Sequence, residues 1–431
     1  MRPDGFTFVR EAGGIREYRL DANGLQVLFL RHGVLPVVTF MVTYRVGSRN
    51  ETAGLSGATH FLEHLMFKGT ERFNRRNATS VFEVLQRVGA QVNATTWFDR
   101  TNYYEQLPAE HLDVAVSIEA DRMRGVLLRA EDVEAERTVI LNEYDRGEND
   151  PYRRLFHEVW STAFRAHPYG TPTIGWRSDI EKVTADELRG FYDTFYYPEN
   201  ATVSVIGGVE ESSALDMIRR HFDSIAHPPV AMPEVRTVEP PQRGERRVEV
   251  HMPGEVGAVL VVYKAGRQVD PTTIPLDVAA TLLADGKTSR LYRALVDEGL
   301  AASVSASCTT LYDPGLFHVY ASCVPGVPHD RVESVILDEI ERLRTEAPTP
   351  AEVRHARTLL TAQMAFARDG SFMIASQLNE AIASGDWSLY PAFLDRVARV
   401  TGRDIQEAAA VTLDEMVRTV GWYVPYSGEA K

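Results

Sequence analysis

One β-rich segment occurs twice in the sequence, and this repeat constrains the fold more than any other feature. The segment "VVTFMVTYRVGSRNE" at residues 37–51 has a counterpart in "VGAVLVVYKAGRQVD" at residues 256–270. Tyr44 matches Tyr263 near the end of each apolar run, 219 residues later, and a helical pattern follows each copy. Self-similarity at a fixed separation indicates a duplicated structural unit. We therefore expect two homologous α/β-sandwich domains.

A proline-rich, charged stretch separates the two copies. Residues 227–246 carry five prolines and show no apolar periodicity, which is typical of an exposed linker. We expect an N-terminal domain at residues 1–226 and a C-terminal domain at residues 247–431. Strands and helices alternate without a regular βαβ pattern, so the predicted fold class is α+β.

The bulk composition excludes several classes of protein. Apolar residues make up 44% of the chain and charged residues 25%, as in ordinary globular proteins. No apolar run reaches the roughly 18–20 residues that a membrane span needs. The net charge of −14 argues against nucleic-acid binding and leaves cationic substrates open. Cys308 and Cys323 are too few for a disulfide framework, and we expect two reduced thiols.

The first residues, "MRPDGFTFVREAGG", lack the apolar core of a secretory signal. We therefore expect a cytoplasmic protein. A chain whose signal had been removed would begin in the same way.

The stretch "GATHFLEHLMFKGT" at residues 57–70 places three titratable side chains in an otherwise apolar helical pattern. His60, Glu63 and His64 fall on one face of the predicted helix, and the leucines and methionine fall on the other. Histidines four residues apart are neighbours, and zinc binds histidine nitrogen readily. Glu63 would lie beside such an ion, where a general base can take a proton from water. We expect Gly69 to end the helix.

The second copy of the segment has the helix without the polar side chains. Ala279, Leu282 and Leu283 occupy the positions that match the two histidines and the glutamate. The fold therefore does not require these polar residues. The alternative to a metal site is a solvated helix face with two incidental histidines.

A third metal ligand is expected from the acidic helical stretch "EDVEAERTVILNEYDRGE" at residues 131–148, because catalytic zinc sites use three protein ligands and a water. Six of its aspartates and glutamates precede Arg146, and exposure to solvent is the simplest role for most of them. Glu136 and Glu143 are seven residues apart, so they lie nearly on one face of the helix.

These segments together resemble the pitrilysin–insulinase family of zinc metallopeptidases. "H-x-x-E-H" is the inverted zincin signature. Its context, "VGSRNE…GLSGATHFLEHLMFKGT", is similar to half-length bacterial members that resemble the β subunit of the mitochondrial processing peptidase. The likeness continues through residues 89–108 and 167–208, and more faintly through residues 286–304. It therefore covers most of the chain.

The resemblance implies roles for individual residues. His60, His64 and Glu143 would bind one Zn²⁺ per chain, because "ERTVILNE" is similar to the family's acidic motif. Glu63 would be the catalytic base. Glu136 would orient a ligand histidine or tune the reacting water.

The segment "QVNATTWFDRTNYYEQL" has the β-branched and aromatic richness of a strand. The resemblance implies that it is an edge strand that pairs with the scissile peptide, since an edge offers N–H and C=O groups to an extended chain. Asn93, through its amide, and Ala94, through its backbone, are the expected substrate contacts. An ordinary strand of a sheet is the alternative.

Active family members also use an Arg and a Tyr from the C-terminal half to stabilise the oxyanion. In the matching segment "SRLYRALVDEGLAASV", Val296 and Ala302 stand at their positions, and Arg290, Tyr292 and Arg293 fall elsewhere in the motif. Full-length members form a closed chamber from four such domains, whereas this chain has two. The resemblance therefore implies one half of a clam-like chamber, in a heterodimer whose homologous partner supplies the Arg and the Tyr.

The predicted function is that of a zinc metalloendopeptidase subunit that hydrolyses short or unfolded peptides. A non-catalytic scaffold subunit of the same fold is the alternative, although such proteins usually lose part of the metal motif. A zinc hydrolase for non-peptide substrates has no sequence feature in its favour. We expect neither a nucleic-acid nor a membrane partner.

Overall fold

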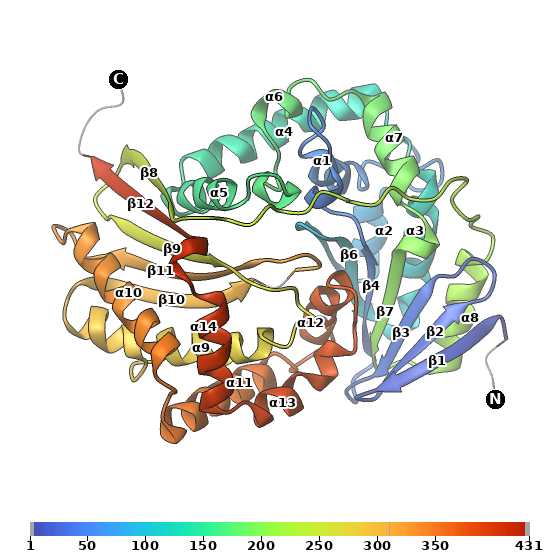
Figure 1. Ribbon diagram of the computed structural model, residues 1–431. Coiled ribbons are helices and arrows are strands. Elements are labelled where there is room, and N and C mark those ends of the chain that lie inside the picture. The colour runs from blue at the N-terminus through green and yellow to red at the C-terminus, as the bar shows by residue number, and fades with distance from the viewer. Residues whose placement is uncertain (1–3, 310, 427–431) are drawn as a thin grey trace. The chain divides into compact units, whose positions relative to one another are not determined.

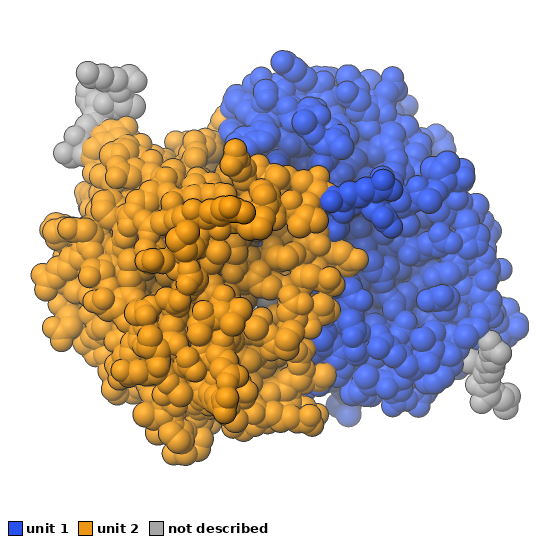
Figure 2. Space-filling view, in the orientation of Figure 1, with its two compact units in different colours: residues 1–144, 171–236, 367–391 blue, residues 145–170, 237–366, 392–431 orange. Residues whose placement is uncertain are grey.

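The computed structural model describes residues 4–309 and 311–426, which form two compact units (Figure 2). Each unit is assembled from three separate segments: unit 1 comprises residues 1–144, 171–236 and 367–391, and unit 2 comprises residues 145–170, 237–366 and 392–431. The chain passes from unit 1 to unit 2 inside the proline-rich stretch. The units are nevertheless not two sequential halves of the chain. Residues 145–170 precede the proline-rich stretch in sequence but belong to unit 2, and residues 367–391 follow it but belong to unit 1. Each of these segments contributes a helix that packs on the sheet of its unit.

Unit 1 contains a seven-stranded sheet in the order β1-β2-β3-β7-β4-β6-β5 (Figure 1). Its strands are β1 Phe6–Ala12, β2 Ile15–Leu20, β3 Gln26–Arg31, β4 Val37–Tyr44, β5 Gln91–Thr96, β6 Thr101–Pro108 and β7 Ala201–Gly207. β3 and β7 run parallel, and all other neighbours in this sheet are antiparallel. β7 is buried along its whole length, as expected for a central strand covered on both faces.

Helices cover this sheet and complete the core of unit 1. They are α1 Ala58–Leu65, α2 Val81–Arg87, α3 Leu112–Gly125, α4 Ala130–Glu148, α6 Arg177–Ile180, α7 Ala185–Phe195, α8 Glu211–Phe222 and α12 Ser371–Ala383. The last residues of α4, from Asp145 on, belong to unit 2. The apolar face of α1, with Phe61, Leu62 and Leu65, is buried in the same core as the strands.

Unit 2 contains a five-stranded sheet in the order β10-β11-β9-β12-β8. Its strands are β8 Arg246–Pro253, β9 Ala258–Lys264, β10 Ala301–Thr309, β11 Leu316–Cys323 and β12 Arg418–Tyr426. The accompanying helices are α5 Pro151–Ala163, α9 Thr273–Ala284, α10 His329–Thr345, α11 Pro350–Phe366 and α14 Gly402–Thr412, together with a π-helical turn at Tyr292–Asp297. α13, Leu389–Arg399, continues from unit 1 into unit 2.

The two sheets share one topology, which confirms the predicted α+β class and the duplication. The order β3-β7-β4-β6-β5 of unit 1 repeats as β8-β12-β9-β11-β10 in unit 2, and the parallel pair β3·β7 recurs as β8·β12. The matched residues Tyr44 and Tyr263 lie near the ends of the equivalent strands β4 and β9. Unit 1 adds the β1–β2 hairpin to this common sheet.

Two local predictions were wrong in detail. The segment at residues 91–107 forms two strands joined by a hairpin turn, in which the Trp97 N–H donates to the Arg100 carbonyl at 2.8 Å. Its continuous β-branched and aromatic composition concealed this turn. α1 ends at Leu65 rather than at Gly69. Gly69 instead has a φ of +123° in the tight reversal that follows the helix.

The two cysteines do not face each other across the β10–β11 hairpin. Cys308 lies opposite Phe317 and Cys323 lies opposite Ala301, and both thiols are free. Within residues 4–309 and 311–426, no helix has the length and apolar character that crossing a bilayer requires.

Candidate metal centre

The N-terminus of α1 is fixed by a buried carboxylate. The backbone N–H groups of Gly57 and Thr59 each donate to Glu51 at 2.8 Å, so two of the donors that lack a partner inside the helix are satisfied. Gly57 has a φ of +83°, and a Cβ there would lie 2.4 Å from the Ile174 carbonyl oxygen. Burial raises the pKa of Glu51 to about 7, against the opposing effect of these hydrogen bonds. The helix that carries both histidines is therefore held in one position.

α1 and α4 bring three potential metal ligands together. The His60 Nε2 and His64 Nε2 atoms lie 3.6 and 3.7 Å from the Glu143 Oε2 atom, and the ligand atoms of all three lie within 4.8 Å of one another. Ligand bonds of about 2.1 Å in tetrahedral geometry give ligand–ligand distances of about 3.4 Å. The two nitrogen–oxygen distances are close to this value, so the three side chains are grouped as the ligands of a zinc ion would be.

The two imidazoles lie in different electrostatic surroundings. Burial, and then the neighbouring His64, lower the pKa of His60 to about 3. Burial alone would also lower the pKa of His64, but the hydrogen bond with Glu136 and the nearby carboxylates together raise it. His60 is thus neutral, which is the form that binds a metal.

Glu136 supports His64 from the side away from Glu143. The Glu136 Oε1 atom lies 2.8 Å from the His64 Nδ1 atom, and its Oε2 atom pairs with the Lys68 ammonium group. When Nδ1 carries the proton and donates it to this carboxylate, Nε2 is unprotonated. Its lone pair then points toward Glu143 and can bind a metal ion. Burial would raise the pKa of Glu136, but the hydrogen bonds with His64 and Lys68 lower it to about 2.

Glu63 lies on the same face of α1 and contacts the end of β5. Its Oε2 atom accepts a hydrogen bond of 2.5 Å from the Thr96 hydroxyl. Burial raises the pKa of Glu63, with the Thr96 hydrogen bond acting in the opposite direction. A carboxylate with a raised pKa is better suited to accept a proton near neutral pH.

Sequence reasoning missed Lys68 and Thr96. Lys68 lies four residues after His64 in the segment predicted to be helical, so its spacing was a usable signal. Thr96 lies 33 residues from Glu63, and nothing in a single sequence pairs the two.

β5, which carries Asn93 and Ala94, lies at one edge of the unit 1 sheet in the described part of the chain, and β1 lies at the other. These residues pair with Tyr104 and Tyr103 of β6, and α1 packs against β5. The Asn93 side chain is exposed and Ala94 is buried. An open edge beside α1 suits an extended peptide. The substrate contacts themselves stay a prediction.

The segment at residues 286–304 offers few donors of the expected kind. Val296 lies in the π-helical turn and Ala302 lies exposed on β10, and neither side chain can donate a hydrogen bond. The Arg290 Nε atom donates to Glu352 at 2.8 Å, and the Arg290 side chain is only 9% exposed. Arg290 is therefore part of a structural ion pair. Tyr292 is half-buried and Arg293 is exposed.

Comparisons with known proteins agree on one family. Residues 28–176 match the family model described as "Insulinase (Peptidase family M16)", and residues 182–360 match the one described as "Peptidase M16 inactive domain". The zinc protease PqqE of Helicobacter pylori is 33% identical in an alignment that covers 77% of this chain and 75% of that protein. The mitochondrial-processing peptidase subunit beta of Lentinula edodes is 26% identical, with 94% and 89% covered.

A solved structure of a protease shares this fold. The crystal structure of a protease from Helicobacter pylori superimposes with a TM-score of 0.89 and 28% sequence identity. The superposition covers 94% of this chain and 98% of that one.

Proposed function

Because the chain belongs to the insulinase family of M16 peptidases, we propose that it is the zinc-binding subunit of a metalloendopeptidase. The observation that carries the proposal is the convergence of two histidine nitrogens and one carboxylate oxygen, with Glu63 on the same helix face. The family's relatives named as zinc proteases support the choice of metal.

Each residue of the site has a separate role in the proposed reaction. His60, His64 and Glu143 would hold the zinc ion, which when bound acidifies water and polarises a carbonyl oxygen. Glu63 takes a proton from the attacking water and passes it to the leaving amine nitrogen. Glu136 keeps the His64 ring in the orientation that binding requires.

The β5 edge is the proposed substrate platform. Pairing through N–H and C=O groups needs an extended backbone and little side-chain specificity. We therefore propose that the substrates are short or unfolded peptides, with Asn93 and Ala94 among the contacts.

The proposed partner is a homologous chain. Val296 and Ala302 cannot stabilise an oxyanion, and Arg290 is engaged by Glu352. A second subunit that supplies an Arg and a Tyr would complete the site within a shared chamber. One relative is itself named as a subunit of a processing peptidase.

A second candidate function is that of a non-catalytic subunit. The missing oxyanion donors favour it, and the family model that covers residues 182–360 is named for an inactive domain. The complete set of metal-binding residues favours the peptidase.

Metal analysis together with a peptide-cleavage assay in the presence of the partner separates the two candidates. We expect about one zinc per chain in the purified protein, and loss of the metal in His64→Ala. His251→Ala, which changes an exposed histidine of β8, is the matched control and should retain zinc. A protein that purifies without metal and does not take up added zinc would contradict the proposal.

A further inference from the structure

A segment from the C-terminal half forms part of unit 1. α12 packs against β4 and β7, and Figure 1 shows it beside the strands of this sheet. The Thr39 and Ser371 hydroxyls lie 2.8 Å apart, and the Thr43 hydroxyl donates to the Asn379 side-chain oxygen at 2.7 Å. All four side chains are buried. Residues 367–391 are therefore built into the face of the sheet.

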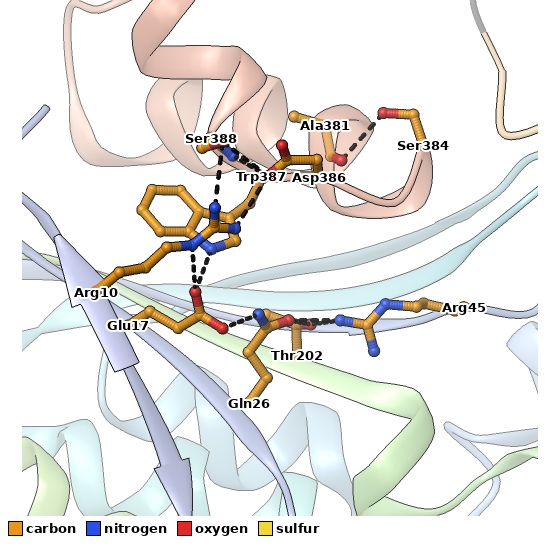
Figure 3. A network of polar contacts seen from close by, with 10 residues as sticks. All are labelled: Arg10, Glu17, Gln26, Arg45, Thr202, Ala381, Ser384, Asp386, Trp387 and Ser388. Atoms are coloured by element: carbon orange, nitrogen blue, oxygen red, sulfur yellow. Dashed lines mark hydrogen bonds and ion pairs between the residues drawn. The ribbon is translucent and has the colours of Figure 1, made fainter. Parts of the chain in front are cut away.

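The loop after α12 is anchored separately, as Figure 3 shows. The Trp387 Nε1–H group donates to Glu17 at 2.7 Å, and Arg10 donates to Glu17 at 2.8 Å and to Asp386 at 2.9 Å. The Glu17 side chain also accepts a hydrogen bond from Gln26. This network fixes the segment at a point remote in sequence from the metal-binding residues.

Near its C-terminal end, α12 reaches the turn between β5 and β6. The Glu380 carboxylate accepts hydrogen bonds from the Arg100 Nε and Nη2 atoms at 3.0 and 2.5 Å. The remaining nitrogen, Nη1, donates to the Thr95 carbonyl and hydroxyl oxygens and to the Asn102 side chain, at 3.2, 2.6 and 2.9 Å. Asn379 adds a hydrogen bond to Asn102. The Arg100 side chain, 12% exposed, thus ties the ends of both strands to α12.

The end of β5 is held on both of its faces. Successive side chains of a strand point to opposite sides. Thr95 accordingly contacts Arg100, and Thr96 donates its hydrogen bond to Glu63 of α1. A continuous set of polar contacts therefore runs from Glu380 through Arg100 and β5 to the carboxylate of Glu63.

We propose that Arg100 and Glu380 are positioning residues, which place Thr96 against Glu63 and fix the β5 edge beside the metal site. This inference rests on the proposed function, because it gives Glu63 the role of the base. Arg100 suits the task because a planar guanidinium group binds acceptors in several directions at once, whereas a lysine ammonium group is a single point of charge.

The energetic reason lies in the sensitivity of catalysis to geometry. A displacement of about 1 Å at a reacting group can cost on the order of 10²-fold in rate. β5 is an edge strand with one neighbour, so its end needs support that the sheet does not provide. α12 gives this support, and its own buried hydrogen bonds with Thr39 and Thr43 hold it against β4 independently of the loop that contains Asp386.

The kinetic test compares Glu380→Gln and Arg100→Lys with Asp386→Asn. Asp386 lies on the same C-terminal segment and also forms an ion pair with an arginine, but it contacts no residue of the β5–β6 turn in the described structure. In the active form of the peptidase, alone or with its partner, we expect kcat to fall about fivefold or more in the first two variants. Zinc content should not change, and Asp386→Asn should keep the wild-type kcat.

Thr96 provides the test of conservative rescue. Thr96→Val keeps the shape and removes the hydroxyl group, so kcat should fall about tenfold with zinc retained. Thr96→Ser restores the donor and should recover most of that loss. Equal activity in the serine and valine variants would overturn the proposal, as would equal losses of kcat in Glu380→Gln and Asp386→Asn.

Amide hydrogen exchange tests the physical link without any assay of activity. Residues 91–96 should exchange faster in Glu380→Gln than in the wild type or in Asp386→Asn. Unchanged exchange would show that Glu380 does not hold β5 and would overturn the inference. Absence of cleavage by the wild-type protein even after addition of its partner would instead overturn the proposed function, and exchange would still decide whether Glu380 holds the strand.

Discussion

Two glutamates of the site illustrate how one residue type takes two roles. Glu136 binds His64 and Lys68, and these hydrogen bonds lower its pKa to about 2. Glu63 is buried with the Thr96 hydroxyl as its hydrogen-bond donor, and burial raises its pKa. The pKa shifts of the two carboxyl groups are therefore opposite in direction. Glu136 stays an anion, whereas Glu63 can exchange a proton.

Replacing Glu63 with Gln should leave zinc binding intact and remove most of the turnover. The amide has nearly the same shape, and Glu63 is not one of the three clustered ligands. Loss of a general base costs roughly 10²–10⁴ in rate. Zinc analysis of the variant, and peptide hydrolysis by the same preparation after addition of the partner, check this result. Activity within a few-fold of the wild type would show that another group is the base.

Replacing Glu136 with Ala should weaken zinc binding while Glu143 stays in place. His64 would lose the acceptor for its Nδ1 proton, and such supporting contacts typically contribute about 10–100-fold to metal affinity. Competition with a chelator measures the change. Glu134→Ala, on the same helix but 68% exposed, is the control and should bind zinc as the wild type does. Equal affinities in the two variants would contradict this role for Glu136.

At the scale of elements, α1 depends on contacts outside itself. It has only eight residues, which is too few for a helix to be stable alone in water. Its stability comes from its buried apolar face and from Glu51, which binds the backbone N–H groups at its N-terminus.

Replacing Glu51 with Ala should therefore destabilise the protein by about 1–3 kcal/mol, because two backbone donors at a buried helix end lose their acceptor. Urea denaturation measures this change. Glu83→Ala removes a carboxylate from the capping box of α2 and should cost less, because Glu83 is exposed and water can replace it as the acceptor. A smaller loss in Glu51→Ala than in Glu83→Ala would refute the role of Glu51 in fixing α1.

Elements with local signals could be predicted from the sequence. The repeated strand, the helix that carries His60 and His64, and the acidic helix at residues 131–148 are examples, because hydrophobic periodicity marks each of them. The pairing of Glu380 with Arg100 could not be predicted, since 280 residues separate them. Likewise, α5 belongs to unit 2 and α12 belongs to unit 1 because of tertiary packing, and no local sequence pattern predicts this.

At the scale of the whole molecule, the duplication shows that the fold forms without the side chains of the candidate metal site. α9 follows β9 as α1 follows β4, but Ala279, Leu282 and Leu283 of α9 are buried and apolar. Unit 2 thus repeats the sheet of unit 1 without the side chains of the candidate metal site. A homodimer would hold two copies of the candidate metal site, and the described segment at residues 286–304 would provide no Arg or Tyr at the expected oxyanion positions.

The measurement that tests this account most directly is peptide cleavage by the zinc-loaded chain alone and after addition of a homologous chain that copurifies with it at native expression level. Loss of one oxyanion donor costs roughly 10²–10³ in turnover. We therefore predict that the chain alone binds zinc and cleaves an unstructured peptide at close to the background rate. The mixture should cleave it, and Glu63→Gln in this chain should abolish that activity. Cleavage by the isolated chain at the rate of the mixture would contradict the account, because the site would then be complete without a partner.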